Sequence, residues 1–192
     1  MARWEPDARG RLVAAALDLF NERGYDQTTV AEIAERAGLT KSTFFRHFPD
    51  KRDVLAAGQD AIAQLLREGV AAAPPDATPL AAVGSGLKSA AAAFTSFNRE
   101  LAPRLKAAIA ASAELQERNA LKQIGLALAM ADALRSRGVP ESTASLAAEL
   151  GALAFKSAYA RWAEPDSDPD QDLGAMACEA LRELRLAASS LD

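Results

Sequence analysis

The sequence predicts an all-α protein of about nine helices, in which a small N-terminal helical domain precedes a larger one. Ala and Leu dominate the composition, Val and Ile are sparse, and no alternating apolar and polar run exceeds a few residues. With 49% hydrophobic and 25% charged residues, the 192-residue chain has the composition of a folded protein. Its length leaves room for one mid-sized domain or for a small domain joined to a larger one.

The first two helices are indicated by their apolar spacing and by their ends. The first follows Asp7 and runs to Arg23, and Gly24 stands where a left-handed cap belongs. Its apolar face comprises Leu12, Val13, Ala16, Leu17, Leu19 and Phe20. Thr29 and Glu32 form the T-x-x-E pattern of a capping box, which predicts that a second helix begins there.

The next segment has the spacing of a helix-turn-helix. Ala34 is small where two helices must approach closely, Gly38 tolerates the turn, and Leu39 fills the angle between the helices. Thr40 caps a third, short helix, which Phe44 anchors inward. The remaining positions of that helix are basic, hydroxyl-bearing or aromatic, namely Lys41, Ser42, Thr43, Phe45, Arg46 and His47. A short helix with this surface fits the major groove of DNA, so we expect DNA binding.

The rest of the chain is also predicted to be helical. A long helix over residues 51–72 leads to a proline-rich linker at 74–79. Five further helices are predicted over residues 80–98, 104–113, 115–137, 141–163 and 171–188. Segment 120–134 is apolar around most of its circumference, so we expect it at the centre of its domain. The expected parts are a DNA-binding domain over 1–50, a connecting helix over 51–72 and a larger domain over 73–192.

The net charge of −4 is unevenly distributed along the chain. Residues 1–55 hold nine Lys and Arg and nine Asp and Glu, so the net negative charge lies entirely in the remainder. Phosphate binding responds to local charge, so an acidic C-terminal part does not exclude DNA binding. It argues against a protein that coats DNA without sequence preference.

Several other function classes lack the residues they need. The sequence holds no Ser/His/Asp or Cys/His set, no Gly-rich phosphate loop and no HExxH, so we do not expect an enzyme. His47 is the only histidine and Cys178 the only cysteine, so no metal site, cofactor or internal disulfide is expected. The chain also lacks a secretory signal and any apolar run of about 20 residues, which favours a cytoplasmic protein without membrane contact.

A longer string is more specific than the helix-turn-helix spacing alone. AALDLFNERGYDQTTVAEIAERAGLTKSTFFRHFPDKRDVL resembles the DNA-binding domain of the TetR (tetracycline-repressor) family of bacterial transcription regulators. The likeness is continuous over about residues 10–56. It includes Phe20…Gly24-Tyr25, Ile33-Ala34…Ala37-Gly38 and Phe44-Phe45-Arg46-His47-Phe48…Lys51…Leu55.

The resemblance assigns roles to residues of the N-terminal domain. Thr29 matches a position that contacts a phosphate through its hydroxyl and backbone N–H, and His47 and Lys51 match phosphate-clamping positions. Lys41 matches a position that faces base edges and can pair with guanine, a contact worth roughly 1–3 kcal/mol of discrimination. Phe45 departs from the family pattern, which usually has Tyr, and so keeps the ring without the hydroxyl. The DNA-binding set is Thr29, Thr40, Lys41, Ser42, Thr43, Phe45, Arg46, His47 and Lys51.

The resemblance also implies that the larger domain binds a small ligand and forms a homodimer through its last two helices. Apolar residues of those helices support a dimer interface, for which the candidates are Leu146, Leu150, Leu153, Ala177, Leu181 and Leu184. A mostly apolar ligand pocket is expected, with candidate lining residues Phe94, Phe97, Leu101, Leu105, Gln123, Met130, Phe155 and Tyr159.

These expectations combine into a ligand-responsive repressor that leaves a pseudo-palindromic, double-stranded DNA operator when a small, mostly apolar effector binds. A transcriptional activator of the same fold is the nearest alternative. An architectural DNA binder without an effector and an all-helical enzyme that carries this N-terminal domain are the other classes considered.

Overall fold

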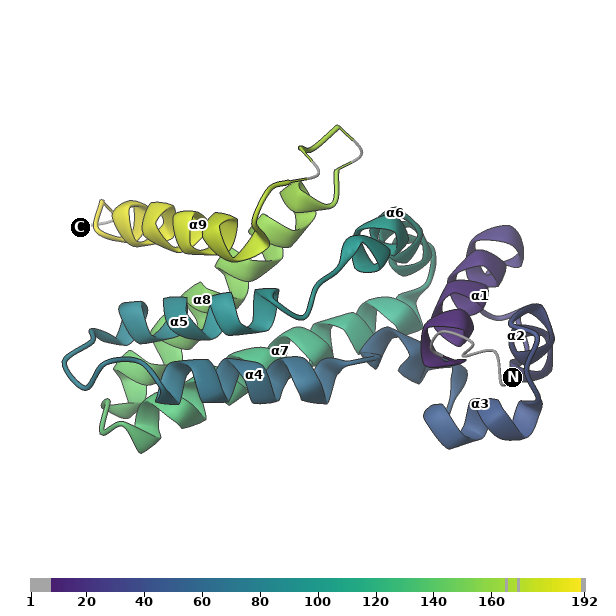
Figure 1. Cartoon of the computed structure of the whole chain (residues 1–192), viewed down its shortest axis with the longest axis horizontal. Coiled ribbons are helices and arrows are strands. Elements are labelled where there is room, and N and C mark those ends of the chain that lie inside the picture. Colours follow the sequence, from purple (N-terminus) through teal and green to yellow (C-terminus); the bar gives the residue numbers. More distant parts are fainter. Residues whose placement is uncertain (1–7, 165, 169, 191–192) are drawn as a thin grey trace, which may run out of the picture. The chain divides into compact units, whose positions relative to one another are not determined.

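The computed structural model describes residues 8–164, 166–168 and 170–190. Helices fill most of this part of the chain, and no strand occurs in it (Figure 1). In chain order the elements are α1 (Ala8–Arg23), α2 (Val30–Arg36), α3 (Lys41–His47), the 3₁₀ helix η1 (Lys51–Ala56), α4 (Gln59–Ala71), α5 (Pro79–Ala91), α6 (Ser96–Ala111), α7 (Ala113–Ser136), α8 (Glu141–Trp162) and α9 (Leu173–Ala188). The predicted all-α class is confirmed.

The chain forms two compact units that do not follow chain order. The first unit comprises Met1–Ala57 and Leu101–Leu121, and the second comprises Gly58–Glu100 and Lys122–Asp192. Residues 101–121 belong to the first unit because apolar residues of α6 and α7, among them Leu115, are buried in the same cluster as residues of α1, α2 and α3.

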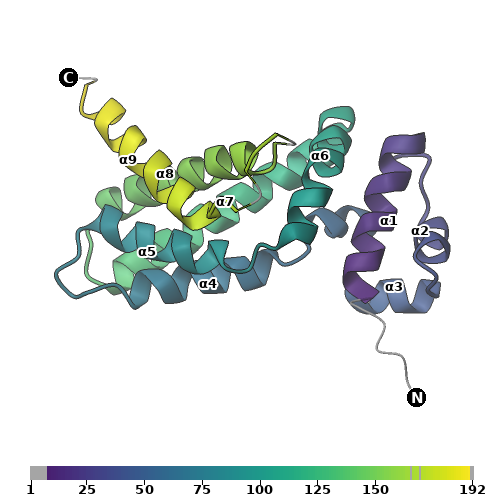
Figure 2. The ribbon, with the colours of Figure 1, turned by 45° about the horizontal axis from the view of Figure 1, so that its top comes forward.

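The first unit is built on α1, α2 and α3. Helix α2 packs against both α1 and α3, and Figure 2 shows α1 lying beside the pair. Phe20 of α1, Ile33 of α2 and Phe44 of α3 are buried in its core. Gly24 ends α1 with a φ of 86°, which confirms the predicted left-handed cap.

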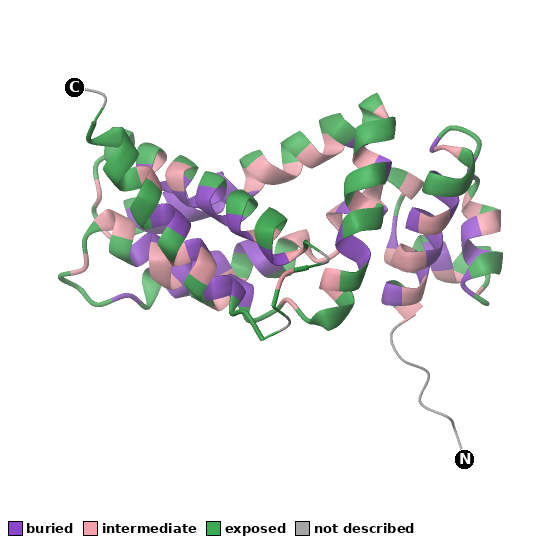
Figure 3. Cartoon of the chain, turned by 90° about the horizontal axis from the view of Figure 1, so that it is seen from above, coloured by how far each residue is buried: buried purple, intermediate pink, exposed green. Residues whose placement is uncertain are grey.

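The second unit is a layered arrangement of α4, α5, α8 and α9 with part of α7. Helix α5 packs against α4, α8 and α9, and α8 packs against α9. Figure 3 shows the buried residues of these helices on their inward faces and exposed residues on the other side. Each helix therefore buries one stripe, as amphipathic helices of globular proteins do.

Two predicted helices are divided in the structure. The helix expected over 51–72 consists of η1 and α4, because Gly58 adopts a left-handed φ of 80° that interrupts helical geometry. The helix expected over 80–98 ends at Ala91, and α6 begins after Thr95, whose N–H and hydroxyl donate to Asn98 Oδ1 at 2.9 and 3.1 Å. Helix α6 then continues through Pro103, whereas the sequence predicts a helix that begins only after this proline.

Segment 120–134 of α7 is buried on one side and exposed on another, which corrects the expectation that it lies at the centre of its domain. Leu126 and Met130 are buried in the core of the second unit. Leu121, Ile124 and Leu128 recur at intervals of three and four residues and are each about half exposed. Helix α7 therefore carries an apolar stripe on its surface as well as one in the core.

Helices α4 and α5 approach so closely that a side chain at Gly86 has no room. A Cβ at Gly86 would lie 2.8 Å from Val70 Cγ2 and 2.9 Å from Leu66 O, whereas one at Gly84 would meet only Cys178 Sγ at 3.7 Å. We expect Gly86→Ala to lower the free energy of unfolding by about 1–3 kcal/mol through overpacking. Gly84→Ala, the same change on the same helix, should leave it unchanged or raise it by up to about 1 kcal/mol. Urea denaturation measures both, and equal effects at the two positions would contradict the packing argument.

Candidate DNA-binding surface

The turn between α2 and α3 is fixed by backbone hydrogen bonds. The N–H of Gly38 donates to Glu35 O at 2.9 Å, and that of Leu39 donates to Ala34 O at 2.8 Å. Gly38 has a φ of 65°, and this pair of bonds around a left-handed residue is a Schellman motif. The side chain of Arg11, from α1, also donates to the carbonyl oxygens of Ala37 and Gly38. The turn before α3 is thus held by backbone bonds to α2 and by a side chain of α1.

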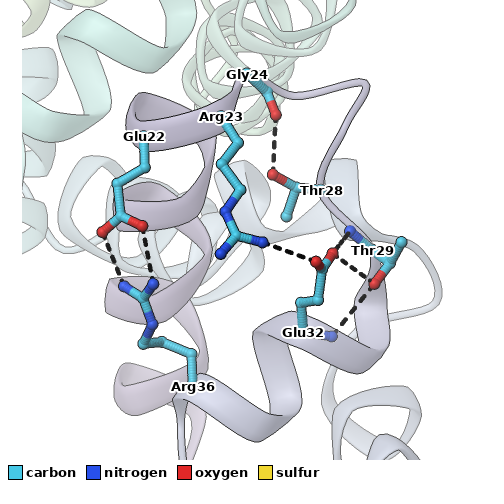
Figure 4. A network of polar contacts seen from close by, with 7 residues as sticks. All are labelled: Glu22, Arg23, Gly24, Thr28, Thr29, Glu32 and Arg36. Carbon is cyan, nitrogen blue, oxygen red and sulfur yellow. Dashed lines mark hydrogen bonds and ion pairs between the residues drawn. The ribbon is translucent and has the colours of Figure 1, made fainter.

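A capping box opens α2, as the sequence predicts. Thr29 N–H and hydroxyl donate to Glu32 Oε2 at 2.9 and 2.8 Å, and Glu32 N–H donates to Thr29 Oγ1 at 3.3 Å (Figure 4). These hydrogen bonds from Thr29 lower the pKa of the Glu32 carboxyl. Both Thr29 donors predicted to meet a phosphate are therefore occupied by Glu32, so a phosphate would bind here by displacing that carboxylate.

Two ion pairs join α1 to α2 beside this cap. Arg23 Nη1 lies 2.9 Å from Glu32 Oε1, and Arg36 donates two hydrogen bonds of 2.9 and 2.8 Å to Glu22 (Figure 4). The bonds from Arg36 lower the pKa of Glu22. Both pairs are largely exposed, so they orient the helices more than they stabilise them.

Helix α3 presents a basic and aromatic face opposite its buried one. Phe44 is fully buried, whereas Lys41, Ser42 and Arg46 are exposed and Phe45 is 49% exposed. Phe45 stands edge-on to Phe44 with ring centroids 5.7 Å apart, and Lys41 Nζ lies 5.8 Å from the centroid of the Phe45 ring. The exposed ring is therefore in contact with the buried Phe44 ring and lies close to the Lys41 ammonium.

The remaining candidates at α3 are two hydroxyl groups that bond each other and one half-buried histidine. Thr40 caps the helix by accepting a hydrogen bond from Thr43 N–H at 3.1 Å, and the two hydroxyl oxygens lie 3.0 Å apart. His47 is half-buried, and its Nε2 is shielded from water without a hydrogen-bond partner in the described part of the chain. A phosphate contact by His47 would require this nitrogen to become accessible.

The ammonium group of Lys51 binds backbone carbonyl groups within the first unit. Its ammonium donates to Tyr25 O at 2.7 Å and to Thr28 O at 2.9 Å, and it lies 4.1 Å from the centroid of the Tyr25 ring. A lysine has three N–H donors, so one is left for a phosphate. Lys51 therefore ties the loop between α1 and α2 to the start of η1, a role that spacing alone did not indicate.

Some of the predicted ligand-pocket residues gather in the second unit. Phe94 lines the larger of two hollows described for this unit. The rings of Phe155 and Tyr159 each lie 5.5 Å from that of Phe94, measured between centroids. Met130 is buried in the core, and Gln123 is half-buried on α7. Of these five residues, only Phe94 lines the hollow.

Three other predicted pocket residues lie elsewhere, which corrects the candidate set. Leu101 and Leu105 pack with the apolar core of the first unit, and Phe97 is 41% exposed on α6. The sequence pattern placed Phe97 with Phe94 because it treated residues 80–98 as one helix. Once the chain turns at Thr95, the following residues face different surroundings.

The candidate dimer residues differ in exposure between α8 and α9. Leu146 and Leu153 of α8 are 64% and 49% exposed, with Leu150 half-buried between them. These three recur at intervals of four and three residues, on the side of α8 opposite its core-facing alanines. On α9, by contrast, Ala177 and Leu181 are buried within the same chain, so they are removed from the candidate interface; Leu184 is half-buried. Helix α9 has one apolar stripe, and its packing on α5 and α8 covers it.

Residues 12–57 match the family of bacterial regulatory proteins called tetR. The HTH-type transcriptional regulator TcmR of Streptomyces glaucescens is 35% identical over 81 residues, which are 42% of this chain and 36% of TcmR. The HTH-type transcriptional activator FasR of Mycolicibacterium smegmatis is 39% identical over 51 residues, which are 27% of this chain and 23% of FasR. The chain thus matches about a third or less of the length of these curated relatives.

The fold is likewise shared with solved structures. The crystal structure of Thermus thermophilus FadR, a TetR-family transcriptional repressor in complex with lauroyl-CoA, aligns with a TM-score of 0.54. The alignment covers 92% of this chain and 93% of that chain at 24% sequence identity. The chain thus shares its all-helical fold with that structure. The match over residues 12–57 identifies the N-terminal domain as that of the tetR family of bacterial regulatory proteins, as the resemblance noted from the sequence predicts.

Proposed function

We propose that the chain is a cytoplasmic transcriptional regulator that binds a pseudo-palindromic DNA operator as a homodimer and is released by a small effector. Its most direct support is the outward face of α3. Lys41, Ser42 and Arg46 are exposed there beside the exposed ring of Phe45, while Phe44 fixes the helix from the buried side. Such a face offers donors to base edges and phosphates without disturbing the core.

A homodimer is supported by the leucine stripe of α8. Leu146 and Leu153 are 64% and 49% exposed, and Leu150 between them is half-buried against the core of the second unit, so the stripe keeps apolar surface that the described residues of this chain do not cover. A two-fold axis through such a stripe makes the surface self-complementary. It also presents two copies of α3 to two half-sites, which is why the operator is proposed to be pseudo-palindromic.

A small, mostly apolar effector is proposed to bind the second unit. Without the effector, the protein is proposed to repress transcription. Support comes from the aromatic cluster of Phe94, Phe155 and Tyr159, and from FadR, a repressor whose crystals contain lauroyl-CoA. The effector would act by preferring a position of α4 that changes the spacing of the two α3 helices. Coupling energies of about 1–3 kcal/mol are typical and change affinity roughly 5–150-fold.

Activation of transcription is the second candidate. FasR, an activator, is among the relatives that match the N-terminal domain. The two outputs share the DNA-binding chemistry and differ in where the operator lies relative to a promoter. A reporter gene placed behind the operator distinguishes them, because deletion of a repressor raises expression and deletion of an activator lowers it.

The DNA-binding proposal is tested by substituting Lys41 and Lys51. We expect Lys41→Ala to lower affinity for the operator and to relax sequence preference, with about 1–3 kcal/mol of discrimination lost. Lys51→Ala should weaken binding to all sequences and reduce the salt slope by about one. Fluorescence anisotropy with operator and scrambled duplexes at several salt concentrations measures both effects.

The control for these variants is Lys106→Ala, which removes an exposed lysine of α6 in the same unit. Its operator affinity should equal that of the unchanged protein. Wild-type affinity in both the Lys41 and Lys51 variants would refute the proposed surface. Thermal unfolding of the Lys51 variant should be recorded alongside, because this side chain also binds two backbone carbonyl groups.

A further inference from the structure

The larger hollow of the second unit has a volume of about 820 Å³ and a lining that combines charged and aromatic side chains. It is formed where the end of α5, the turn at residues 92–95, the start of α6, the end of α8 and the start of α9 meet. Its lining includes Lys88, Phe94, Arg99, Glu100, Trp162 and Asp172. The volume falls in the range of roughly 300–1,000 Å³ that is usual for small-molecule sites.

Arg99 is a half-buried side chain of this lining. Its Nη1 donates to Asp168 O at 3.2 Å, and its guanidinium carbon lies 4.5 Å from the centroid of the Trp162 ring. Its Nε and Nη2 are shielded from water and have no hydrogen-bond partner among the described residues. The N–H groups of these two atoms point to the same side, as a fork that matches the two oxygens of a carboxylate.

Among the charged groups of the lining, Arg99 is the one best suited to bind an anion. Asp172 Oδ1 accepts a hydrogen bond from Ala175 N–H at 2.8 Å and so caps α9, and Glu100 is exposed to water. Lys88 contributes a second cation at the rim. The N-terminal end of α9, a 16-residue helix, adds its partial positive charge on the same side. A negative group in the hollow would therefore find donors that have no acceptor once the Arg99 guanidinium turns towards it.

Aromatic residues provide the apolar part of the same site. Phe94 lies 6.4 Å from Trp162 between ring centroids at an interplanar angle of 87°, and both line the hollow. Trp162 is held in place by the hydrogen bond from its Nε1 to Gln171 O at 3.2 Å. The ring of Tyr159 packs against both, with its centroid 5.5 Å from that of Phe94 and 5.9 Å from that of Trp162. An apolar body can thus lie against fixed rings while its acidic group reaches Arg99.

We propose that this hollow binds an organic acid, with a carboxylate on the Arg99 fork and a compact apolar body against Phe94 and Trp162. Because the fork is closed off from water, the guanidinium must turn towards the hollow as the ligand enters. The inference deepens the proposed function by giving the effector a negative charge, and it depends on that function only for the regulatory consequence of binding.

The test is equilibrium dialysis of the purified full-length protein without DNA. The probes are 2-naphthoate and decanoate, each paired with its neutral primary amide. We expect at least one acid to bind at least tenfold more tightly than its amide, because only the acid supplies two charged acceptors to the fork. Equal affinity for acid and amide in both pairs, or no binding of either acid, would overturn the inference.

Substitutions at Arg99 locate the binding. Arg99→Gln should weaken binding of the acid at least tenfold and leave binding of the amide unchanged. Arg99→Lys, which keeps the charge and loses the fork, should bind with intermediate affinity. The matched control is Arg161→Gln, because Arg161 precedes Trp162 on α8, is exposed and does not line this hollow. If the Arg161 and Arg99 variants lost equal affinity for the acid, the effect would come from the net charge of the protein, and the proposed site would be wrong.

Two further measurements separate this inference from the proposed function. Near-ultraviolet circular dichroism should show the same tertiary structure in Arg99→Gln and in the unchanged protein, and Arg99→Lys serves as the test variant if the glutamine variant is misfolded. Operator affinity without any acid should be the same in Arg99→Gln and the unchanged protein. If the protein bound the acids but no operator, the proposed function would be refuted, whereas the proposed acid-binding site at Arg99 would be retained.

Discussion

Replacing Phe44 with alanine is expected to unfold the first unit and abolish operator binding. Phe44 has no exposed surface, and its ring lies 5.7 Å from that of Phe45 and 5.6 Å from that of Phe48. Truncating a buried phenylalanine costs about 3–5 kcal/mol, because the lost burial adds to the cavity left behind. Domains are stable by only about 5–15 kcal/mol, so this change removes a large part of the margin. Urea denaturation followed by circular dichroism measures it.

The adjacent phenylalanine provides the control for this experiment. Phe45→Ala makes the same truncation at a ring that is 49% exposed, so the free energy of unfolding should change by no more than about 0.5 kcal/mol. Operator affinity should nevertheless fall, because the ring lies on the proposed DNA surface. If Phe44→Ala were as stable as Phe45→Ala, the assignment of the two faces of α3 would be wrong.

The helix-turn-helix could be predicted in detail because its signals are local. A Thr and a Glu three residues apart determine the start of α2, and a glycine with positive φ determines its end. The Schellman bonds at Gly38 then follow from backbone geometry alone. Each of these features depends on residues within about one helical turn, so no knowledge of the tertiary structure was needed.

The second unit was less predictable because its features join residues that are distant in sequence. The stripes of α8 and α9 look alike as sequence, yet one is exposed and the other covers α5. The hollow brings Arg99 to Trp162, 63 positions along the chain, and no local pattern indicates that pairing. The break at Gly58 is an intermediate case, since a glycine permits a left-handed residue without requiring one.

The second large effect is expected from charging the α8 stripe. A variant with both Leu146→Lys and Leu153→Lys should be monomeric in sedimentation velocity, because two lysines in each copy would face two in the other across an apolar contact. Both positions are 49% exposed or more, so the fold of the single chain should be retained. A monomer engages one half-site at a time, so operator affinity should fall by about 10²–10⁴-fold, the usual gain from linking two binding modules.

The matched control for the dimer is Leu128→Lys. Leu128 of α7 is 54% exposed and belongs to the stripe of Leu121 and Ile124, so the same substitution is made at equal exposure on a different helix. This variant should remain dimeric and bind the operator with unchanged affinity. A monomeric Leu128→Lys beside a dimeric α8 variant would assign the interface to α7 instead. The two variants therefore distinguish which exposed stripe a second copy covers, since both stripes are apolar and both recur at helical spacing.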